Sequence, residues 1–256
     1  IILSGDCDMG NGYSIALVNV LVGTILTGNP LVGLVGLLIF IAAYMGMAAL
    51  IHLRNIPAIV VTLGAQFVWY GIALILCPTP GGSCPEMISN FFKLKTPVIP
   101  LPIIIAVLAG LVCWMILYRT RYGMVMRGIG NNPNSVERSG WNYLTAKMVN
   151  YGMAGLIVVL AGMTYTVSCN GADANSSVNY CMLSIATVIL GGCEMAGGVV
   201  APAGVVIAAV AMNLIHSLLT AMKVDSNYQT AIIGLILIGV LAFKFIIHRK
   251  GASRNE

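Results

Sequence analysis

The sequence has very little charge: 8% of its 256 residues are Asp, Glu, Lys or Arg, whereas 59% are hydrophobic. Soluble domains carry about 25% charged and about 45–50% apolar residues, so these charges are too few to cover a water-facing surface of this size. The shortage excludes an ordinary soluble enzyme, a nucleic-acid-binding domain and a disordered tail. The formal net charge of +5 does not indicate nucleic acid, because the basic residues lie between apolar runs, where they orient membrane proteins.

Familiar catalytic and nucleotide-binding patterns are missing as well. The sequence contains neither HExxH nor GxxxxGK[ST], and its glycine-rich stretch GGCEMAGG has no lysine to meet a phosphate. The three histidines, His52, His216 and His248, are scattered at separate span ends and do not assemble a site. We therefore expect no catalytic residue, no cofactor and no metal, with any ATP hydrolysis carried out by another chain.

What the chain does have is long apolar runs. A helix that crosses ~30 Å of hydrocarbon needs ~20 mostly apolar residues, whereas barrel strands would be ~10 residues long with alternating polarity. The runs fit helices, so we predict an all-α, polytopic membrane helix bundle in which residues 1–256 form a single transmembrane domain. Seven segments are clear: 9–28, 31–51, 56–76, 99–118, 148–168, 203–222 and 229–248.

An eighth segment, 181–198, is weaker because it contains four glycines and Glu194. It predicts a broken or re-entrant helix, which membranes tolerate only where protein or a water-filled cavity surrounds the backbone. The chain also begins at Ile1 with no Met and no basic leader, and IILSG is similar to the tail of an apolar segment. We therefore expect the chain to be truncated at its N-terminus, with about eight membrane segments in this fragment.

The distribution of Lys and Arg predicts the orientation. If the eight segments cross alternately, ten of the thirteen basic residues fall on one side, which we predict to be cytoplasmic together with the C-terminus. The other side receives Lys93, Lys95 and Lys223. The ten residues on the basic side are Arg54, Arg119, Arg121, Arg127, Arg138, Lys147, Lys244, Arg249, Lys250 and Arg254.

Four of the seven cysteines fall outside the cell in this orientation, where disulfides persist. Cys77 and Cys84 flank the turn-rich insert in CPTPGGSC, which could bring them together, so we predict a disulfide between them. Cys169 and Cys181 flank a polar loop and form a second candidate pair. The alternative is that all four are unbridged thiols.

The most polar stretch is the predicted cytoplasmic segment 119–147. Within it, Asn132 can cap a helix, Pro133 suits its first position and Gly140 suits the residue just past its end, so we predict a short helix at about 133–139. A rigid exposed helix between two spans offers a surface that a cytoplasmic partner can push; the alternative is a solvated loop. The expected coupling residues are Gly130, Asn132, Pro133, Ser135, Glu137, Arg138 and Gly140.

Polar side chains at membrane depth usually face the interior of a bundle, and some of them are expected to line a transport route. A neutral solute needs hydrogen-bonding partners and no fixed counter-charge; the alternative for each residue is a bond to its own or a neighbouring helix. Asp8 is interpreted as such a helix-start or interhelical partner. The candidates for the route are Gln66, Asn150, Tyr151, Thr187, Glu194 and Asn213, with Asn19, Thr24, Thr62, Trp69 and Tyr70 as secondary ones.

Four stretches, in order along the chain, carry a family resemblance. RTRYGMVMRGIGNNPNSVERSGWN resembles the cytoplasmic coupling segment of bacterial ABC-importer permeases for simple sugars of the ribose/galactose/xylose type. LSGDCDMGNGYSIAL, IPAIVVTLGAQFVWYGIALIL and SIATVILGGCEMAGGVVAPAGVVIAA are similar to three further motifs of that family. Asp6, Asn11, Trp141, Glu194 and Pro202 depart from its usual pattern, which leaves the solute open, nucleosides and signalling furanones included.

The resemblance implies the permease subunit of an ATP-binding-cassette importer that moves a monosaccharide or similar small polar solute inward across a bacterial inner (plasma) membrane. It also implies the partners: a second permease subunit, identical or not, two cytoplasmic ATPase subunits and an extracytoplasmic substrate-binding protein. Nucleic acid is not expected. Two alternatives stay open: a branched-chain amino-acid permease of the same superfamily, and an ion-coupled secondary carrier, which usually places ionisable residues at mid-span.

Overall fold

The computed structural model describes residues 1–92, 101–194 and 197–225, with residues 228–229, 231–232, 234–236, 238–239 and 242 beyond them. The chain divides into two compact units, one made of Ile1–Cys181 and Glu194–Val199, the other of Met182–Cys193 and the residues from Val200 onward. Across the described ranges the elements are helical, with one isolated β-bridge between Gly81 and Ala172. The prediction of an all-α chain is confirmed.

Four helices are long and apolar enough to cross a membrane. They are α2 (Pro30–Arg54), α3 (Ala58–Leu76), α8 (Tyr143–Cys169) and α10 (Pro202–Ala221). Shorter apolar helices cover Asn11–Leu26, Val107–Arg119 and Tyr180–Leu190. The other elements are η1 (Ile2–Ser4), α1 (Asn11–Val20), the π-helical η2 (Leu21–Leu26), α4 (Glu86–Phe92), α5 (Leu101–Arg119), α6 (Arg121–Asn131), α7 (Pro133–Arg138) and α9 (Tyr180–Leu190).

This set confirms the membrane helices only in part. In the predicted broken segment 181–198, α9 has 11 residues, or about 16 Å of helix, which is too short to cross ~30 Å of hydrocarbon. Non-helical backbone follows it over the described residues 191–194 and 197–201. The predicted segment 229–248 lies mostly outside the described residues. The number of eight membrane segments therefore stays a prediction.

The ends of the two longest helices show how the sequence sets their lengths. α2 begins with Pro30, which tolerates the first helical position because its missing N–H would have no partner there. α8 begins after Asn142, whose side chain accepts the N–H of Thr145 at 3.2 Å. Each helix ends at an asparagine with positive φ, Asn55 and Asn170, both at φ 50°, a conformation that asparagine adopts more readily than most residues.

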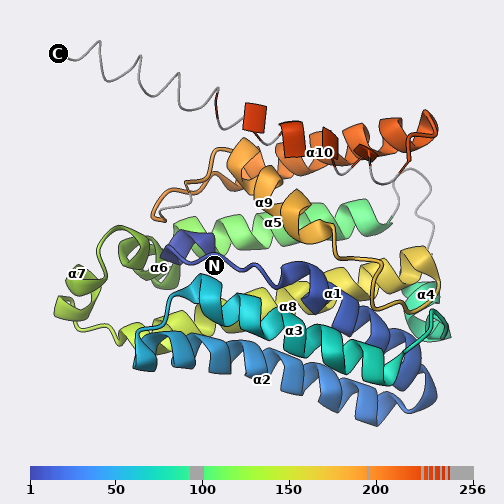
Figure 1. Ribbon diagram of the computed structural model, residues 1–256. Coiled ribbons are helices and arrows are strands. Elements are labelled where there is room, and N and C mark those ends of the chain that lie inside the picture. The colour runs from blue at the N-terminus through green and yellow to red at the C-terminus, as the bar shows by residue number, and fades with distance from the viewer. Residues whose placement is uncertain are drawn as a thin grey trace. The chain divides into compact units, whose positions relative to one another are not determined.

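The core of the first unit lies among α1, α2, α3 and α8, which pack side by side in Figure 1. Tyr44 of α2 and Tyr151 of α8 are fully buried there. Glycines let these helices approach closely: an added Cβ at Gly162 of α8 would overlap the side chain of Val18 on α1. Small residues at helix contacts are the usual basis of packing within bilayers, where association depends on close van der Waals contact.

At the end of this core, a fully buried asparagine joins α1 to the segment after α8. The Asn19 amide donates to Thr166 Oγ1 at 3.0 Å and to the carbonyl oxygen of Gly171 at 2.9 Å, and its oxygen accepts the N–H of Asp173 at 2.9 Å. Asn19 is therefore bonded within the bundle, which is the alternative that the sequence left open for it.

The predicted bridge between Cys77 and Cys84 is absent from this described part of the chain. Both cysteines are buried, and neither belongs to a disulfide. The Cys77 thiol lies 3.1 Å from the carbonyl oxygen of Thr79, within its own turn. The insert between the two cysteines instead pairs with the segment after α8, through two backbone hydrogen bonds between Gly81 and Ala172.

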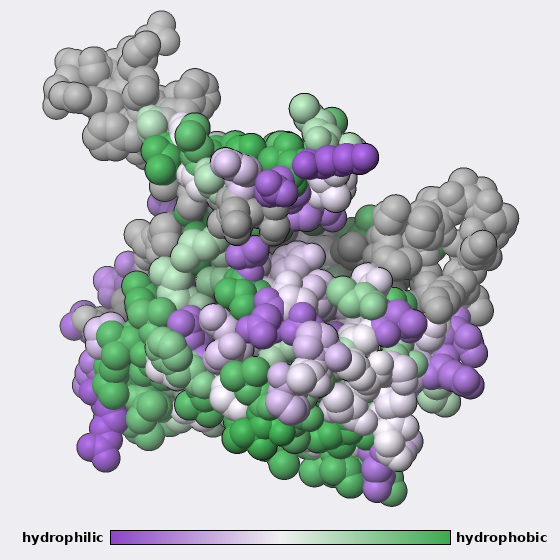
Figure 2. All heavy atoms as spheres, turned by 45° about the vertical axis from the view of Figure 1, so that its right-hand side comes forward, coloured by the Kyte–Doolittle hydropathy of each residue, from purple (hydrophilic) through white to green (hydrophobic). Residues whose placement is uncertain are grey.

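One side of α2 presents apolar side chains outward. Leu31, Leu34, Leu38 and Ile39 are each more than half exposed, and Figure 2 shows apolar side chains gathered over the lower part of the view, where α2 lies. Monomeric soluble proteins rarely expose apolar patches of this extent. The helices of this unit therefore fit a lipid environment.

The second unit is built on α9 and α10. The end of α9 meets the start of α10 without side chains between them, because an added Cβ at Gly191 would overlap the backbone of Val205, and one at Gly204 the carbonyl of Gly191. Gly191 and Gly204 thus form a close helix-packing contact, as small residues commonly do within membranes.

Candidate functional site

The short helix predicted in the polar segment is present as α7. The Asn132 side chain accepts the N–H of Ser135 at 3.4 Å, and Pro133 occupies the first helical position. Gly140 follows the helix end with φ +82°, and its N–H donates to the carbonyl of Glu137 at 3.0 Å. This left-handed conformation favours glycine. The helix and both of its predicted ends are confirmed.

α7 presents polar side chains outward and is anchored by one apolar residue. Ser135, Glu137 and Arg138 are exposed. Val136 is buried with Ile129 of α6 and with other apolar side chains of α6 and α8. Because its apolar face is packed and its ends are capped, α7 is a firm support for the exposed side chains rather than a solvated loop.

The sequence analysis missed α6, which precedes α7. Its N-terminus is capped by Thr120, whose hydroxyl accepts the N–H of Gly123 at 3.2 Å. Its buried face includes Val125, Met126 and Ile129. The signal was available as a threonine cap followed by apolar residues at helical spacing, but the density of arginines in this stretch favoured a loop.

Gly130 has a packing role that the sequence analysis did not predict. It lies on the inner side of α6, where an added Cβ would overlap the backbone of Leu3 and of Gly198. The N–H of Gly198 also donates to the carbonyl of Leu3 at 3.0 Å. Three segments far apart in the sequence, all within the first unit, therefore meet at Gly130: α6 itself, the N-terminal residues around Leu3, and the stretch around Gly198.

We expect Gly130→Ala to destabilise the first unit. The added methyl group would meet backbone atoms, which cannot turn aside as a side chain can, and overpacking of this kind costs about 1–3 kcal/mol. Resistance to SDS unfolding in mixed micelles would measure the loss. Gly46→Ala is the matched control, since its added Cβ meets nothing within 4 Å; equal resistance of the two variants would contradict the packing role.

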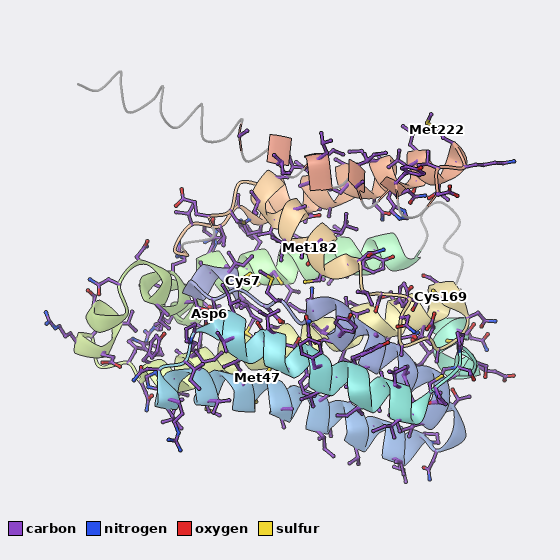
Figure 3. All side chains as sticks on the ribbon, in the orientation of Figure 1. Asp6, Cys7, Met47, Cys169, Met182 and Met222 are labelled. Carbon is purple, nitrogen blue, oxygen red and sulfur yellow. The ribbon has the colours of Figure 1, made fainter. Side chains whose placement is uncertain are left out.

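The N-terminal segment, residues 4–10, is held by polar side chains of α8. The Asp6 carboxylate pairs with the Lys147 ammonium at 2.9 Å, with the two side chains 11% and 5% exposed, and it accepts the Tyr151 hydroxyl at 3.2 Å. The Asn150 amide donates to Ser4 Oγ at 2.9 Å. Asp6 and Cys7 lie beside α3 in Figure 3. Lys147 is therefore a buried partner of Asp6, and its place on the predicted cytoplasmic side stays a prediction.

Other helices hold the same segment from its opposite side. The Asp8 carboxylate accepts the Tyr44 hydroxyl of α2 at 3.0 Å. The Thr62 hydroxyl of α3 accepts the N–H of Met9 at 3.2 Å and lies 3.3 Å from the carbonyl of Cys7. Asp8 also accepts the N–H of Gly10, the residue just before α1, at 2.8 Å. The interpretation of Asp8 as a helix-start or interhelical partner is confirmed, and side chains satisfy backbone groups of this non-helical stretch.

The remaining route candidates are dispersed. Gln66 is half-buried on α3 and Glu194 is half-buried in the non-helical stretch of the first unit. In the second unit, Thr187 donates to the carbonyl of Leu183 in its own helix, and Asn213 is exposed on α10. Of the six main candidates, all of them within the described residues, only the sequence neighbours Asn150 and Tyr151 bond to the N-terminal segment, through Ser4 and Asp6.

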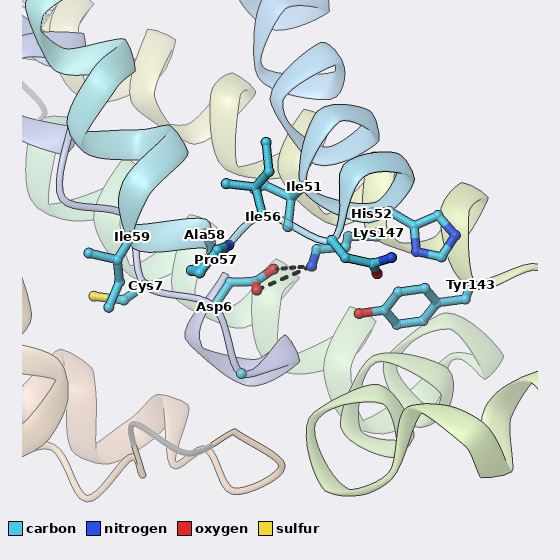
Figure 4. A pocket seen from close by; sticks show the side chains of 12 residues that line it. Asp6, Cys7, Ile51, His52, Ile56, Pro57, Ala58, Ile59, Tyr143 and Lys147 are labelled. Carbon is cyan, nitrogen blue, oxygen red and sulfur yellow. Dashed lines mark hydrogen bonds and ion pairs between the residues drawn. The ribbon is translucent and has the colours of Figure 1, made fainter.

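A cavity of about 680 Å³ lies where α2 ends and where α3 and α8 begin. Figure 4 shows the Asp6–Lys147 pair at its wall, with the Tyr143 hydroxyl pointing toward the pair and His52 beside the Tyr143 ring. The ring centroids of His52 and Tyr143 are 4.8 Å apart. The cavity is lined by Gly5, Asp6, Cys7, Ile51, His52, Asn55, Ile56, Pro57, Ala58, Ile59, Tyr143 and Lys147.

None of the described residues forms a group of three His, Cys, Asp or Glu side chains that could hold a metal ion. What the first unit offers is a rigid exposed helix, an ion pair between an irregular segment and a long helix, and a cavity of mixed polarity. These features suit a transport protein.

A family model described as "Branched-chain amino acid transport system / permease component" matches residues 6–241. The chain belongs to this permease family.

Individual relatives agree with the family match. The chain is 30% identical to the ribose import permease protein RbsC of Bacillus subtilis (strain 168), over 94% of this chain and 77% of the relative. It is 24% identical to the autoinducer 2 import system permease protein LsrD of Enterobacter sp. (strain 638), over 98% and 80%. The LsrD protein of Escherichia coli O157:H7 is 27% identical, over 98% and 79%. No solved structure matches the chain. The protein is thus a multi-pass membrane permease.

Proposed function

We propose that this permease is the membrane subunit of an ATP-driven importer that moves a monosaccharide or similar small polar solute into the cell. The observation that carries the proposal is the family match along residues 6–241, joined by relatives whose names assign them to ribose import and autoinducer 2 import. Apolar helices provide the barrier that such a subunit needs.

The power for import would come from two ATPase subunits docked on the inner face. We assign the docking to the segment 119–147, in which α7 exposes Ser135, Glu137 and Arg138. A capped helix seated on a small apolar cluster can transmit a push, because displacing it must also displace α6 and the start of α8. Movement of the spans would then expose the solute route to one face at a time.

The membrane arrangement of this proposal follows the basic residues. The segment 119–147 and the C-terminus lie in the cytoplasm, and the protein sits in a bacterial inner membrane with both compact units forming one transmembrane domain of about eight segments. A second permease subunit, the same or different, completes the route. An extracytoplasmic binding protein delivers the solute to the opposite face.

Some of the route candidates keep this role in the proposal. Gln66 and Glu194 are half-buried and Asn213 is exposed, so all three can meet a solute or a second subunit. Asn150 and Tyr151 already bond to Ser4 and Asp6, and we assign them to holding the N-terminal segment in place. Thr187 bonds within its own helix and is left out of the route.

The second candidate solute class is a branched-chain amino acid, which the family description names. A zwitterion needs a cation and an anion that do not already neutralise each other. Among the described residues of the first unit, the buried Lys147 already meets Asp6. A neutral solute therefore fits better, and the names of the individual relatives point the same way.

Reconstitution tests the proposal directly. The permease, its ATPase and its binding protein are placed in liposomes with ATP on the ATPase side, and uptake is measured for radiolabelled ribose, galactose and xylose, for autoinducer 2 and for leucine. We expect ATP-dependent uptake of a sugar or of autoinducer 2, with none of leucine. Uptake driven by a pH gradient without ATP would instead identify an ion-coupled carrier, and uptake of leucine alone would identify an amino-acid permease.

A further inference from the structure

The cavity beside the Asp6–Lys147 pair has the composition of a small-molecule site. Such sites commonly measure about 300–1,000 Å³ and combine apolar or aromatic walls with a few converging polar groups. Here the apolar walls come from Ile51, Ile56 and Ile59. The polar groups come from Asp6, His52, Asn55, Tyr143 and Lys147. The wall belongs to three helix ends and to the N-terminal segment, all within the first unit.

The polar lining offers both donors and acceptors but no unbalanced charge. The Lys147 ammonium is bound to both oxygens of Asp6, at 2.9 and 3.2 Å, and it lies 5.6 Å from the centre of the Tyr143 ring. Asp6 Oδ2 also accepts the Tyr151 hydroxyl, whereas Oδ1 has no second bond among those of the described residues. A carboxylate oxygen can accept two hydrogen bonds, so Oδ1 keeps capacity for a hydroxyl group.

The other polar groups complete a surface suited to hydroxyl groups. Asn55 can donate and accept through its amide, His52 through its imidazole and Tyr143 through its hydroxyl. The Tyr143 ring adds an aromatic face against which the C–H groups of a small ring can pack. Because Asp6 and Lys147 neutralise each other, an ion entering the cavity would find no counter-charge, while a neutral polyol would find both donors and acceptors in place of water.

We propose that this cavity is a solute subsite at the inner end of the transport route, and that it takes a neutral polyhydroxylated molecule. The inference rests on the proposed import function and adds to it a site that the sequence analysis did not include. Its place follows from the predicted orientation, since the cavity lies at the ends of α2 and α8 that adjoin Arg54 and the segment 119–147. A solute leaving the route would pass it before reaching the cytoplasm.

Cys7 provides a chemical test because it lines the cavity. A variant in which Cys7 is the sole cysteine is assembled with its ATPase and binding protein, and a membrane-impermeant sulfonated thiol reagent is added to one face at a time. The probe is whichever of ribose, galactose, xylose or autoinducer 2 the wild-type complex imports. We expect modification from the cytoplasmic face, slowed about tenfold by the probe at ten times its dissociation constant for the cavity and not slowed by leucine.

Two further variants, made in the wild-type background, test the lining itself. Asn55→Gly removes the amide while suiting the backbone at φ 50°, and Tyr143→Phe removes the hydroxyl while keeping the ring beside His52. Each should lower the maximal import rate about three- to tenfold, the effect of one neutral hydrogen bond. The half-saturating concentration should stay unchanged, because the binding protein sets capture of the solute.

The controls are Asn170→Gly, which removes an amide at the same φ of 50° but outside the cavity, and Tyr165→Phe, which loses a hydroxyl bonded to the Ser176 carbonyl. Both should import at the wild-type rate.

Modification of Cys7 only from the outer face, or unslowed modification in a complex that imports the probe, would overturn the subsite and leave the import function standing. Slowing by leucine would overturn the neutral ligand class. A complex that imports none of the four probes would overturn both.

Discussion

Replacing Arg138 with glutamate should lower import about 100-fold or more while leaving the protein folded and inserted in the membrane. Arg138 is exposed in the last turn of α7, where it can meet an acidic group of the ATPase. Reversing a charge at an interface costs several kcal/mol, because like charges are then brought together. The measurement is ATP-dependent uptake in proteoliposomes, alongside co-purification of the ATPase with the permease.

A second variant tests the stiffness of the same helix. Gly140→Pro should give a similar loss of uptake, because proline fixes φ near −65° where Gly140 has +82°, and because the N–H that reaches Glu137 is removed. The control is Arg54→Glu, another exposed arginine of the predicted cytoplasmic side, at the end of α2. Normal uptake by both α7 variants, or an equal loss on changing Arg54, would refute the docking role of α7.

Removing the Lys147 ammonium should cause the largest loss of stability. Lys147→Met leaves the Asp6 carboxylate buried without its cation, and breaking a buried pair from one side costs about 3–5 kcal/mol. The side chains are only 5% and 11% exposed, so little solvent reaches the carboxylate to compensate for the missing ammonium. Equilibrium unfolding with SDS in mixed micelles would measure the change in the free energy of unfolding.

Neutralising both partners separates the charge from the packing. The double variant Asp6→Asn, Lys147→Gln keeps the size of the first side chain, shortens the second slightly and leaves no buried charge, so it should recover more than half of the lost free energy. Lys223→Met, at an exposed lysine of the second unit, should stay within about 0.5 kcal/mol of the wild type. A double variant as unstable as Lys147→Met would show that the pair acts through shape and not through charge.

The membrane helices were largely predictable because a bilayer imposes both length and polarity on each span. α2, α3, α8 and α10 match four of the predicted runs for this reason. The limits of α7 were predictable because capping uses residues adjacent in sequence. Asn132 and Gly140 act on their own helix, so no knowledge of the fold was required.

The Asp6–Lys147 pair was not predictable in the same way, because its partners are 141 residues apart and each looks unremarkable alone. Lys147 was counted only as one of the basic residues of the predicted cytoplasmic side, although Lys147, Asn150 and Tyr151 recur on one face of α8. Gly130 makes the same point. It was predicted as a coupling residue, whereas its packing against the backbone of Leu3 is visible only in the folded chain.

The way residues 4–10 are held has a consequence for how the first unit can move. Side chains from α2, α3 and α8 all bond to this one irregular strip of backbone. If one of these helices slid past another, it would break these hydrogen bonds and leave buried polar groups without partners. The three helices are therefore fixed in register by residues 4–10, and we expect them to move as one rigid body during transport, with the flexible positions outside this group.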